Sequence, residues 1–347
     1  MKLHRRVFSR LPILAAAFGL LVANPVSGAA DITSVIPVND GLPTNVGSAH
    51  ILWQKSHYVS QAQTNPNQLL YHGGAVETTP AVYLVFWGPS WQSGFSTTQG
   101  NYTYTNTTAE QYLEGFFGNV GGSPWNGVQS QYCQGAAIGA VNCNGAVNPQ
   151  FVGNPKHLLK GVWVDPSTVP NPIVTTALVE NTTNDPVANE ALKASSYFGY
   201  DVNATYVILT EPGIQATAYG SVYCAYHSET SHALGSYGTR YAFVPYVMDQ
   251  GAGCGENSVN ASNDAFGNGY FDGYSIVGGH EFAEAETDPD NYNGTQDGWN
   301  DATTSENGDK CAWYNTQNIT LGDNFYAVQP MWSNNANNGQ GGCAVTP

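Results

Sequence analysis

Several continuous apolar runs along the chain predict buried β-strands. The clearest is Ala81–Trp87 (AVYLVFW), which is rich in β-branched and aromatic residues and is followed by a Gly-Pro pair. Thr205–Thr210 (TYVILT) and the shorter Val162–Val164 have the same character. Tyr241–Val247 (YAFVPYV) also predicts a strand. Its internal proline favours an edge position or a bulge, because proline cannot donate a ladder hydrogen bond.

Other segments carry the spacing of helices. Ala109–Gly118 (AEQYLEGFFG) has apolar residues at the intervals of an amphipathic helix. Ile173–Ala194 predicts a helix that is interrupted near Asn184–Pro186. A further helix is predicted from about Tyr274 to Thr287, because the proline at position 289 disfavours helix in the residue before it.

Strands and helices alternate through the first 210 residues, whereas the last third is rich in Gly, Asn and Asp. No repeat of fixed period and no interdomain linker is visible. This pattern predicts an α/β or α+β fold. We expect a single domain with a mixed central sheet, flanking helices and a loop-rich C-terminal third.

The N-terminus has the pattern of a secretory signal. Basic residues in positions 1–10 precede a short apolar run and a small-residue zone that ends near Ala30. The run is shorter than the roughly 20 residues that span a bilayer. We therefore predict a signal peptide over residues 1–30, export from the cell, and no membrane association after cleavage. Residues 31–65 lack periodicity and predict an extended arm or propeptide-like lead, and residues 66–347 form the domain.

The cysteine count agrees with export. An even number of cysteines in a secreted chain predicts three disulfides, for which fifteen pairings are possible. We predict sequential pairing. No CxxC motif is present, which argues against a cysteine-rich zinc site. The six residues are Cys133, Cys143, Cys224, Cys254, Cys311 and Cys343.

The charge balance excludes two classes of partner. The chain has 26 acidic and 10 basic residues, a formal net charge of −16. Nucleic-acid binders and proteins of anionic membrane surfaces need clustered Lys and Arg, which this chain lacks after the predicted signal peptide. The acidic residues are unevenly distributed, because nine of them lie between positions 281 and 309.

Crowded carboxylates repel one another unless a cation or protons neutralise them, so the segment 281–309 predicts a metal site.

The motif His280-Glu281-x-x-Glu284 gives this site a specific form. His280 and Glu284 are four residues apart and share one face of the predicted helix. This is the layout of the HExxH zinc helix with Glu in place of the second His, and zinc accepts carboxylate oxygen. Glu281 would act as general base. Glu306, 22 residues after Glu284, is the predicted third ligand, at a spacing similar to that of thermolysin-like metallopeptidases.

Other residues compete for roles around this motif. Asp309 and Asp288 are predicted to hydrogen-bond the ligands, and Asp288, Asp290 and His227 are alternative third ligands. His227 lies in Tyr223–Ser228 (YCAYHS) and could bind metal, contact substrate or pack in the core. We assign it, or its neighbour Tyr226, to oxyanion stabilisation. Calcium is the rival metal, since Asp288, Asp290, Asp297 and Asp301 could build an all-oxygen site.

Four segments, in order along the chain, carry a resemblance to a known family. These are Leu69–Gly74 (LLYHGG), Val82–Gly88 (VYLVFWG), Gln131–Cys133 and Tyr223–Ser228. They resemble the exordium (phosphate-induced protein) family, whose plant members are extracellular proteins linked to cell growth. Microbial members are similar in a further stretch. There HE-x-A-E-A-x-TDP precedes a Trp-Asp segment and E-x-G-D-K-C, which correspond to His280–Pro289, Trp299, Asp301 and Glu306–Cys311. The resemblance implies secretion and a shared architecture.

These observations lead to two functional hypotheses. The first is a secreted, monomeric, zinc-dependent peptidase-like hydrolase that acts on polypeptides with a metal-activated water. The second is a non-catalytic extracellular protein, associated with cell wall or carbohydrate, with a structural metal site. The 8 Trp and 21 Tyr residues suit the second hypothesis, because aromatic rings stack on apolar sugar faces.

Overall fold

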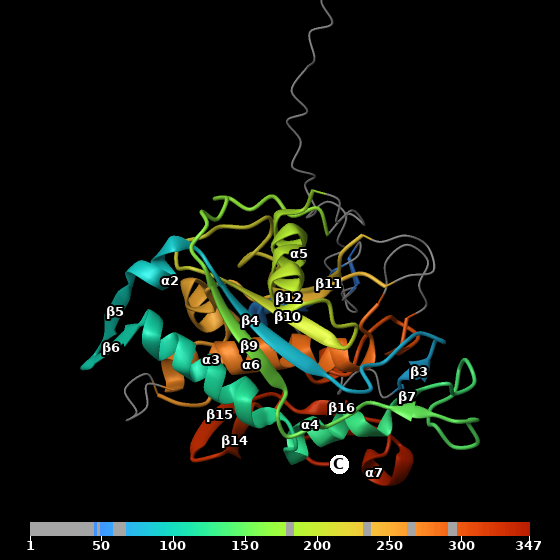
Figure 1. Cartoon of the computed structure of the whole chain (residues 1–347). Helices are drawn as coiled ribbons and strands as arrows, with labels where there is room; N and C mark the ends of the chain where they lie inside the picture. Colours follow the sequence, from blue (N-terminus) through green and yellow to red (C-terminus); the bar gives the residue numbers. More distant parts are fainter. Residues whose placement is uncertain are drawn as a thin grey trace, which may run out of the picture. The chain divides into compact units, whose positions relative to one another are not determined.

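A seven-stranded mixed sheet lies at the centre of the computed structural model, with the strand order β1-β2-β11-β12-β10-β4-β9 (Figure 1). Strands β12, β10, β4 and β9 pair in parallel, and β11, β2 and β1 extend the sheet through antiparallel pairs. The fold class predicted from the sequence is therefore confirmed. The seven strands are β1 (Asn45–Val46), β2 (Ala49–Trp53), β4 (Ala81–Trp87), β9 (Leu159–Asp165), β10 (Ala204–Thr210), β11 (Tyr223–Glu229) and β12 (Arg240–Phe243).

The structure describes residues 45–46, 49–57, 67–177, 184–231, 237–261, 268–290 and 297–347. All of them belong to one compact unit, residues 32–347. The predicted signal peptide, residues 1–30, lies outside the described residues. No helix in the described ranges has the length and apolarity needed to cross a bilayer.

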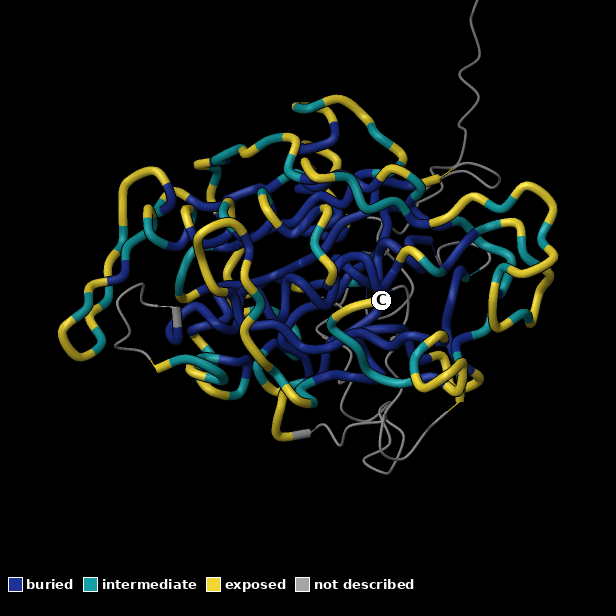
Figure 2. The backbone as a smooth tube through the Cα atoms, turned by 90° about the horizontal axis from the view of Figure 1, so that it is seen from below, coloured by how far each residue is buried: buried dark blue, intermediate teal, exposed yellow. Residues whose placement is uncertain are grey.

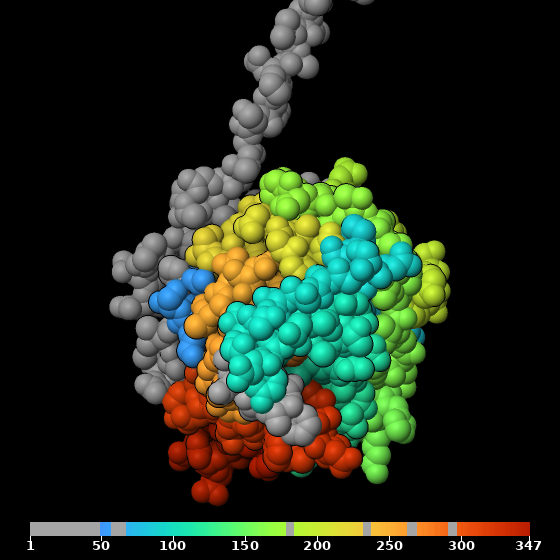
Figure 3. Space-filling view, turned by 90° about the vertical axis from the view of Figure 1, so that its left-hand side faces the viewer, coloured from blue at the N-terminus to red at the C-terminus, as the bar shows by residue number. Residues whose placement is uncertain are grey.

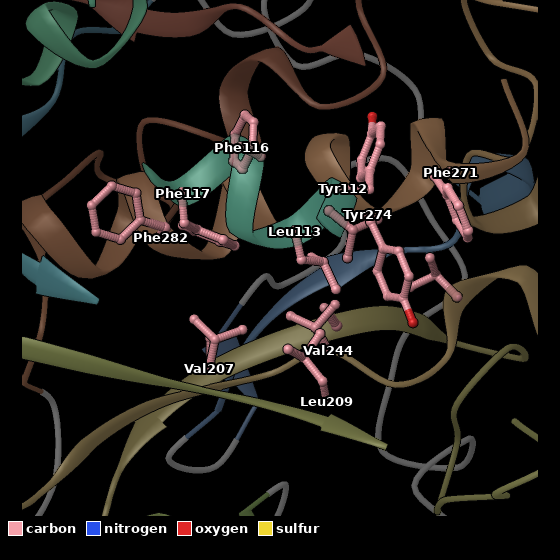
Figure 4. Packing of buried hydrophobic residues seen from close by; sticks show 14 of the residues in the cluster. Tyr112, Leu113, Phe116, Phe117, Val207, Leu209, Val244, Phe271, Tyr274 and Phe282 are labelled. Carbon is pink, nitrogen blue, oxygen red and sulfur yellow. The ribbon is translucent and has the colours of Figure 1, made fainter. Parts of the chain in front are cut away.

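Helices cover both faces of the sheet. Alternate residues of a strand point to opposite faces, so Leu84 and Phe86 of β4 pack in one apolar cluster and Val85 and Trp87 in another. The first cluster contains residues of α3 (Asn106–Val120) and α6 (Asn268–Thr287), and the second contains residues of α5 (Pro186–Phe198). Figure 4 shows the first cluster, in which aromatic side chains of α3 and α6 meet valine and leucine side chains from the sheet.

The predicted strands and helices are largely present, with two corrections. Among the described residues of the segment predicted as helix from Ile173, the α-helix begins at Pro186, because the Asp185 side chain accepts hydrogen bonds from Val187 N and Ala188 N and caps a helix there. Ile173 instead forms a β-bridge with Ala216.

The strand predicted over Tyr241–Val247 is the second correction. Strand β12 ends at Phe243, and Pro245 lies after it. Since the proline is outside the ladder, it does not confine the strand to an edge. Strand β12 lies inside the sheet between β11 and β10.

Helix α6 is the element on which the predicted site depends. It ends at Thr287, as expected from the proline two residues later, but begins at Asn268 and is longer than predicted. All its described side chains are buried, and most of the tube near the centre of the unit is coloured as buried (Figure 2). At Gly279 a Cβ atom would lie 3.1 Å from the ring of Phe116 of α3. The Gly-Gly pair before His280 therefore lets α3 pack closely against the start of the motif.

Short elements complete the unit, and three disulfides connect them. The disulfides join Cys133–Cys143, Cys224–Cys254 and Cys311–Cys343, which confirms the sequential pairing and fits an oxidising compartment. Figure 3 shows β5, β6 and α3 in cyan and teal at the middle of one face, with C-terminal residues in red below them. The short elements are η2 (Lys55–His57), β3 (Leu70–Tyr71), α2 (Pro89–Ser93), β5 (Ser96–Gln99), β6 (Tyr102–Thr105), α4 (Pro124–Gly127), η3 (Val128–Gln131), β7 (Cys133–Gln134), β8 (Gln150–Phe151), η5 (Val247–Cys254), β13 (Trp299–Asn300), η6 (Asp309–Cys311), β14 (Gln317–Leu321), β15 (Asn324–Val328), β16 (Met331–Ser333), α7 (Ala336–Gly339) and β17 (Gly342–Ala344).

Candidate metal centre

Helix α6 contributes three ionisable side chains that are fully buried: His280, Glu281 and Glu284. His280 Nε2 lies 3.0 Å from Glu284 Oε1, as expected for residues four positions apart on a helix. The helix packs against β11, β12 and β2. Its ionisable side chains therefore belong to the interior of the molecule and not to a solvated face.

The sheet contributes two histidines from neighbouring strands. His227 of β11 and His50 of β2 are directly paired in the antiparallel register, and their rings stack with centroids 4.5 Å apart. Leu52 of β2 belongs to the cluster that packs against α6. Because residues two apart in a strand share a face, His50 also points toward α6. His227 Nδ1 lies 3.1 Å from Glu281 Oε2 and 3.6 Å from Glu284 Oε2.

The segment around Glu306 supplies the remaining two carboxylates. Asp309 N donates to Glu284 Oε1 at 2.8 Å, and Glu306 N donates to Asp309 Oδ2 at 3.0 Å. Glu306 Oε1 lies 3.7 Å from His227 Nε2, and its Oε2 contacts His50 Nδ1.

Hydrogen bonds to neighbouring elements hold this segment against α6. Asn307 Nδ2 donates to Ala283 O at 3.0 Å, and Gln329 Nε2 donates to Gly308 O at 2.7 Å. The Cys311–Cys343 disulfide begins two residues after Asp309. These bonds fix the backbone that carries the two carboxylates.

Seven side chains thus form one buried cluster, in which three sets of three could each hold a metal ion. In each set the ligand atoms lie within 4.8 Å of one another. We call the set His280, Glu284 and Asp309 the helix triad, and the set His50, His227 and Glu306 the strand triad. The third set joins His227 to Glu281 and Glu284.

Several ligand atoms of the cluster are buried and have no hydrogen-bond partner. His280 Nε2 is one of them, because its contact with Glu284 Oε1 is not aligned as a hydrogen bond. A buried polar atom without a partner costs about 1–3 kcal/mol. A cation would satisfy several of these lone pairs at once. The atoms are His227 Nε2, His280 Nδ1 and Nε2, Glu281 Oε1, Glu284 Oε2 and Glu306 Oε1.

Burial shifts the acid–base equilibria of the cluster toward its uncharged forms. It raises the pKa of Glu281, Glu284 and Glu306 well above the usual range, and neighbouring carboxylates raise those of Glu281 and Glu306 further. Burial lowers the pKa of His280 to about 4 and that of His227 well below its usual value. The histidines are therefore neutral and can act as ligands, while the carboxyls hold protons that a metal ion would displace.

The structure distributes the predicted site residues differently from the sequence interpretation. His280 and Glu284 share a triad with Asp309, which was expected only to orient a ligand, while Glu306 lies with the two strand histidines. Asp288 lies beside the cluster, where its carboxylate accepts hydrogen bonds from Gly298 N and Asn300 Nδ2.

The four aspartates considered for calcium do not form a candidate group among the described residues. Asp290 pairs with Arg240, with Nη2 at 2.5 Å from Oδ2. Asp301 pairs with Lys310, with Nζ at 2.7 Å from Oδ2. Two of the four carboxylates are therefore engaged by cationic side chains.

His50 is the site residue that the sequence interpretation missed. It lies in the segment 31–65, which predicted an extended arm, yet all five residues of β2 are buried in the central sheet. The run AHILW is a short apolar strand signal, which could have been recognised. Nothing local links its histidine to a partner 177 positions further along the chain.

Comparisons with known proteins add no assignment. No protein-family profile, no curated protein and no solved structure matches this chain.

Proposed function

We propose that this protein is a zinc-dependent hydrolase whose ion is held by the helix triad. The supporting observation is the set of buried ligand atoms without hydrogen-bond partners around the His280-Glu281-x-x-Glu284 turn. His280 Nε2 lies 3.0 Å from Glu284 Oε1 and 3.7 Å from Asp309 Oδ1. Two ligands of a tetrahedral zinc ion, each bonded at 2.0–2.2 Å, lie about 3.4 Å apart. The three residues therefore fit zinc without a large movement.

The donor atoms favour zinc over the alternatives. The triad combines one imidazole with two carboxylates, and imidazole nitrogen is a common zinc ligand. Calcium prefers oxygen ligands throughout, and all six cysteines are in disulfides. A mixed nitrogen and oxygen set thus supports zinc.

Glu281 is suited to the role of general base. Its Oε2 lies 3.1 Å from His227 Nδ1, within hydrogen-bond distance, while its Oε1 has no hydrogen-bond partner. A bound zinc ion lowers the pKa of water and polarises a carbonyl group. Glu281 Oε1 would accept a proton from the water that attacks the carbonyl carbon, and would return it to the leaving nitrogen as the carbon–nitrogen bond breaks.

A peptide bond is the substrate that this arrangement suits, because the leaving amine needs the proton that Glu281 has taken up. The three disulfides agree with an extracellular place of action. The motifs shared with the exordium family lead us to place the chain among its secreted microbial members. The proposed function is therefore a secreted peptidase-like hydrolase.

A second candidate function is favoured by one observation. No side chain of the cluster is more than 2% exposed, which suits a structural metal ion in a non-catalytic extracellular protein. Exposed aromatic side chains, including Tyr197 stacked on Trp163 at 4.7 Å, would then serve carbohydrate binding.

One pair of variants separates the two functions. Glu281→Gln keeps the three helix-triad ligands and removes the base, so we expect a full complement of zinc and a loss of peptide hydrolysis of about 100-fold or more. The control is Glu286→Gln, a buried residue of the same helix that accepts a hydrogen bond from Asn126 outside the cluster. Zinc retention in both proteins, with no hydrolysis of casein or peptide libraries by the wild type, would favour the structural role.

A further inference from the structure

We propose that the cluster holds a second divalent ion in the strand triad, so that the protein has a two-metal centre. This inference rests on the proposed ion in the helix triad. The two triads have no residue in common. They also come from different elements: the helix triad from α6 and the segment after it, and the strand triad from β2, β11 and Glu306. Two ions could therefore be held without sharing a ligand residue.

The hydrogen bonds of His227 prepare it to bind metal through Nε2. Its Nδ1 lies within hydrogen-bond distance of Glu281 Oε2, and in the tautomer that donates this bond from Nδ1 the lone pair is on Nε2. This Nε2 is buried, has no hydrogen-bond partner and lies 3.7 Å from Glu306 Oε1, which also has none. Metal-bound histidines almost always donate their other ring N–H to a carboxylate or carbonyl. His227 Nε2 and Glu306 Oε1 therefore have the spacing and the orientation of two ligands of one metal ion.

His50 completes the strand triad from the neighbouring strand. Its ring stacks on that of His227, with an angle of 21° between the planes, and its Nδ1 contacts Glu306 Oε2. The two oxygens of Glu306 are thus divided between the two histidines. Two imidazoles and one carboxylate form a common ligand set for zinc and other first-row metals.

The charge of the ionised cluster also matches that of two divalent ions. Glu281, Glu284, Glu306 and Asp309 carry four negative charges when all of them are ionised. The cationic side chains nearby are paired elsewhere, Lys310 with Asp301 and Arg240 with Asp290. One divalent ion would leave two buried negative charges, whereas two ions balance all four. Burying unpaired charges is costly, so the second ion stabilises the ionised cluster.

A two-metal centre would extend the chemistry of the proposed function to the same substrate class. In two-metal hydrolases the ions stabilise the attacking and the leaving atoms of the reaction together. Glu281 lies between the triads, since its Oε2 contacts His227 of the strand triad while its neighbours on α6 form the helix triad. It would therefore take the proton from a water that both ions activate.

Metal counting on the whole protein tests this inference. The protein is stripped with a chelator, reloaded with Zn²⁺ or Co²⁺ and desalted, and the bound metal is measured by mass spectrometry. We expect two equivalents in the wild type and about one in His227→Asn, His50→Asn and His280→Asn. The matched control is His72→Asn, a histidine whose Nε2 lies 3.3 Å from Asn300 O, outside both triads, and it should keep two equivalents.

Each outcome decides between the claims. One equivalent in the wild type that persists in His50→Asn and His227→Asn but disappears in His280→Asn would overturn the second ion and leave the proposed function intact. One equivalent that every cluster variant removes would mean a single shared ion and would also overturn it. No bound metal would refute both proposals. Thermal unfolding identifies any variant that fails to fold, and His50→Asn and His227→Asn test the same triad independently, so either one that folds carries the test.

Discussion

At the scale of single residues, the site depends on which atom of each side chain is already engaged. Glu281 and His227 are joined by one hydrogen bond, and this bond leaves Glu281 Oε1 and His227 Nε2 without partners. In each of the two side chains, one atom therefore fixes the orientation through a hydrogen bond, and the other is available to a ligand. This division, and not residue type alone, supports a metal centre.

Gly308 provides a residue-scale test of the helix triad. A Cβ atom at this position would lie 2.9 Å from both Glu284 Oε1 and His280 Nδ1, while its backbone φ of −74° is open to alanine. Gly308→Ala should therefore push the two ligands apart without straining the backbone. We expect zinc affinity to fall at least tenfold, measured by competition with a chromogenic chelator.

The control for this variant is Gly278→Ala on α6. There the new Cβ would make only an ordinary contact, 3.5 Å from Phe117. It should leave zinc affinity unchanged. Equal affinities in the two variants would show that the helix triad does not bind the ion.

The sequence predicted the local part of this site and missed its long-range part. His280 and Glu284 could be recognised because helical spacing places them on one face, and Glu281 because it directly follows His280 in the motif. His50 could not, because its place beside His227 depends on the pairing of β2 with β11. The choice between Glu306 and Asp309 also could not be made from spacing, since it depends on how the segment folds back on α6.

At the scale of elements, β2 and the segment around Glu306 complete the site. Strand β2 lies in the segment that was expected to form an extended arm or propeptide-like lead, but Ile51, Leu52 and Trp53 are buried in the two main apolar clusters. The strands β4 and β10 were predicted well, because a continuous apolar run can be recognised without knowing which strand it pairs with. Helix α5 and strand β12 were misjudged at their ends, where an aspartate cap and a proline outside the ladder determine the boundary.

Truncation tests the contribution of β2. A chain that begins at residue 45 keeps β2, and we expect it to fold and bind metal like the chain that begins at residue 31. A chain that begins at residue 58 loses His50 and three large buried side chains, each worth about 1.5–3 kcal/mol on burial. It should fail to fold or to bind metal. Full metal content in the shorter chain would show that β2 is dispensable.

The disulfides provide a second element-scale test. Cys311–Cys343 closes a separation of 32 residues and lies next to Asp309, whereas Cys133–Cys143 closes 10 residues, and neither of its cysteines adjoins a triad residue in sequence. Replacing either pair with serine should lower the free energy of unfolding by about 2–4 kcal/mol. Only loss of Cys311–Cys343 should also weaken zinc binding. Equal zinc affinities in both variants would show that the Cys311–Cys343 disulfide does not stabilise the segment that carries Glu306 and Asp309.

At the scale of the whole molecule, charge is concentrated where it is least exposed to water. The chain has a net charge of −16 but few charged residues, 10% in all, and the seven-residue cluster is buried. Sequence composition predicted a metal near these acids without locating it. Folding brings together carboxylates from α6 and the Glu306 segment with histidines from two strands.

The metal-free protein should therefore lose stability as the pH rises. Burial raises the pKa of Glu281, Glu284 and Glu306, so the folded state keeps protons that the unfolded chain releases above about pH 4.5. Their stabilisation is complete below that pH and declines as the pH rises. His227 and His280 have lowered pKa values, and their contribution changes only below about pH 6.5.

Above pH 6.5 only the carboxyl effect remains. The free energy of unfolding of the metal-free protein should fall by about 1.4 kcal/mol per pH unit for each retained proton. The zinc-loaded protein should not show this fall, because the ion has displaced the protons. Urea unfolding between pH 6.5 and 8.5 measures both, and a metal-free protein whose stability rises over this range would contradict the account.

The most direct measurement of the central claim is an anomalous difference map from crystals of the zinc-loaded protein, recorded on both sides of the zinc absorption edge. We expect a strong peak among His280 Nε2, the Glu284 carboxylate and Asp309 Oδ1. A map without a peak at this position, from protein whose zinc content has been established, would contradict it.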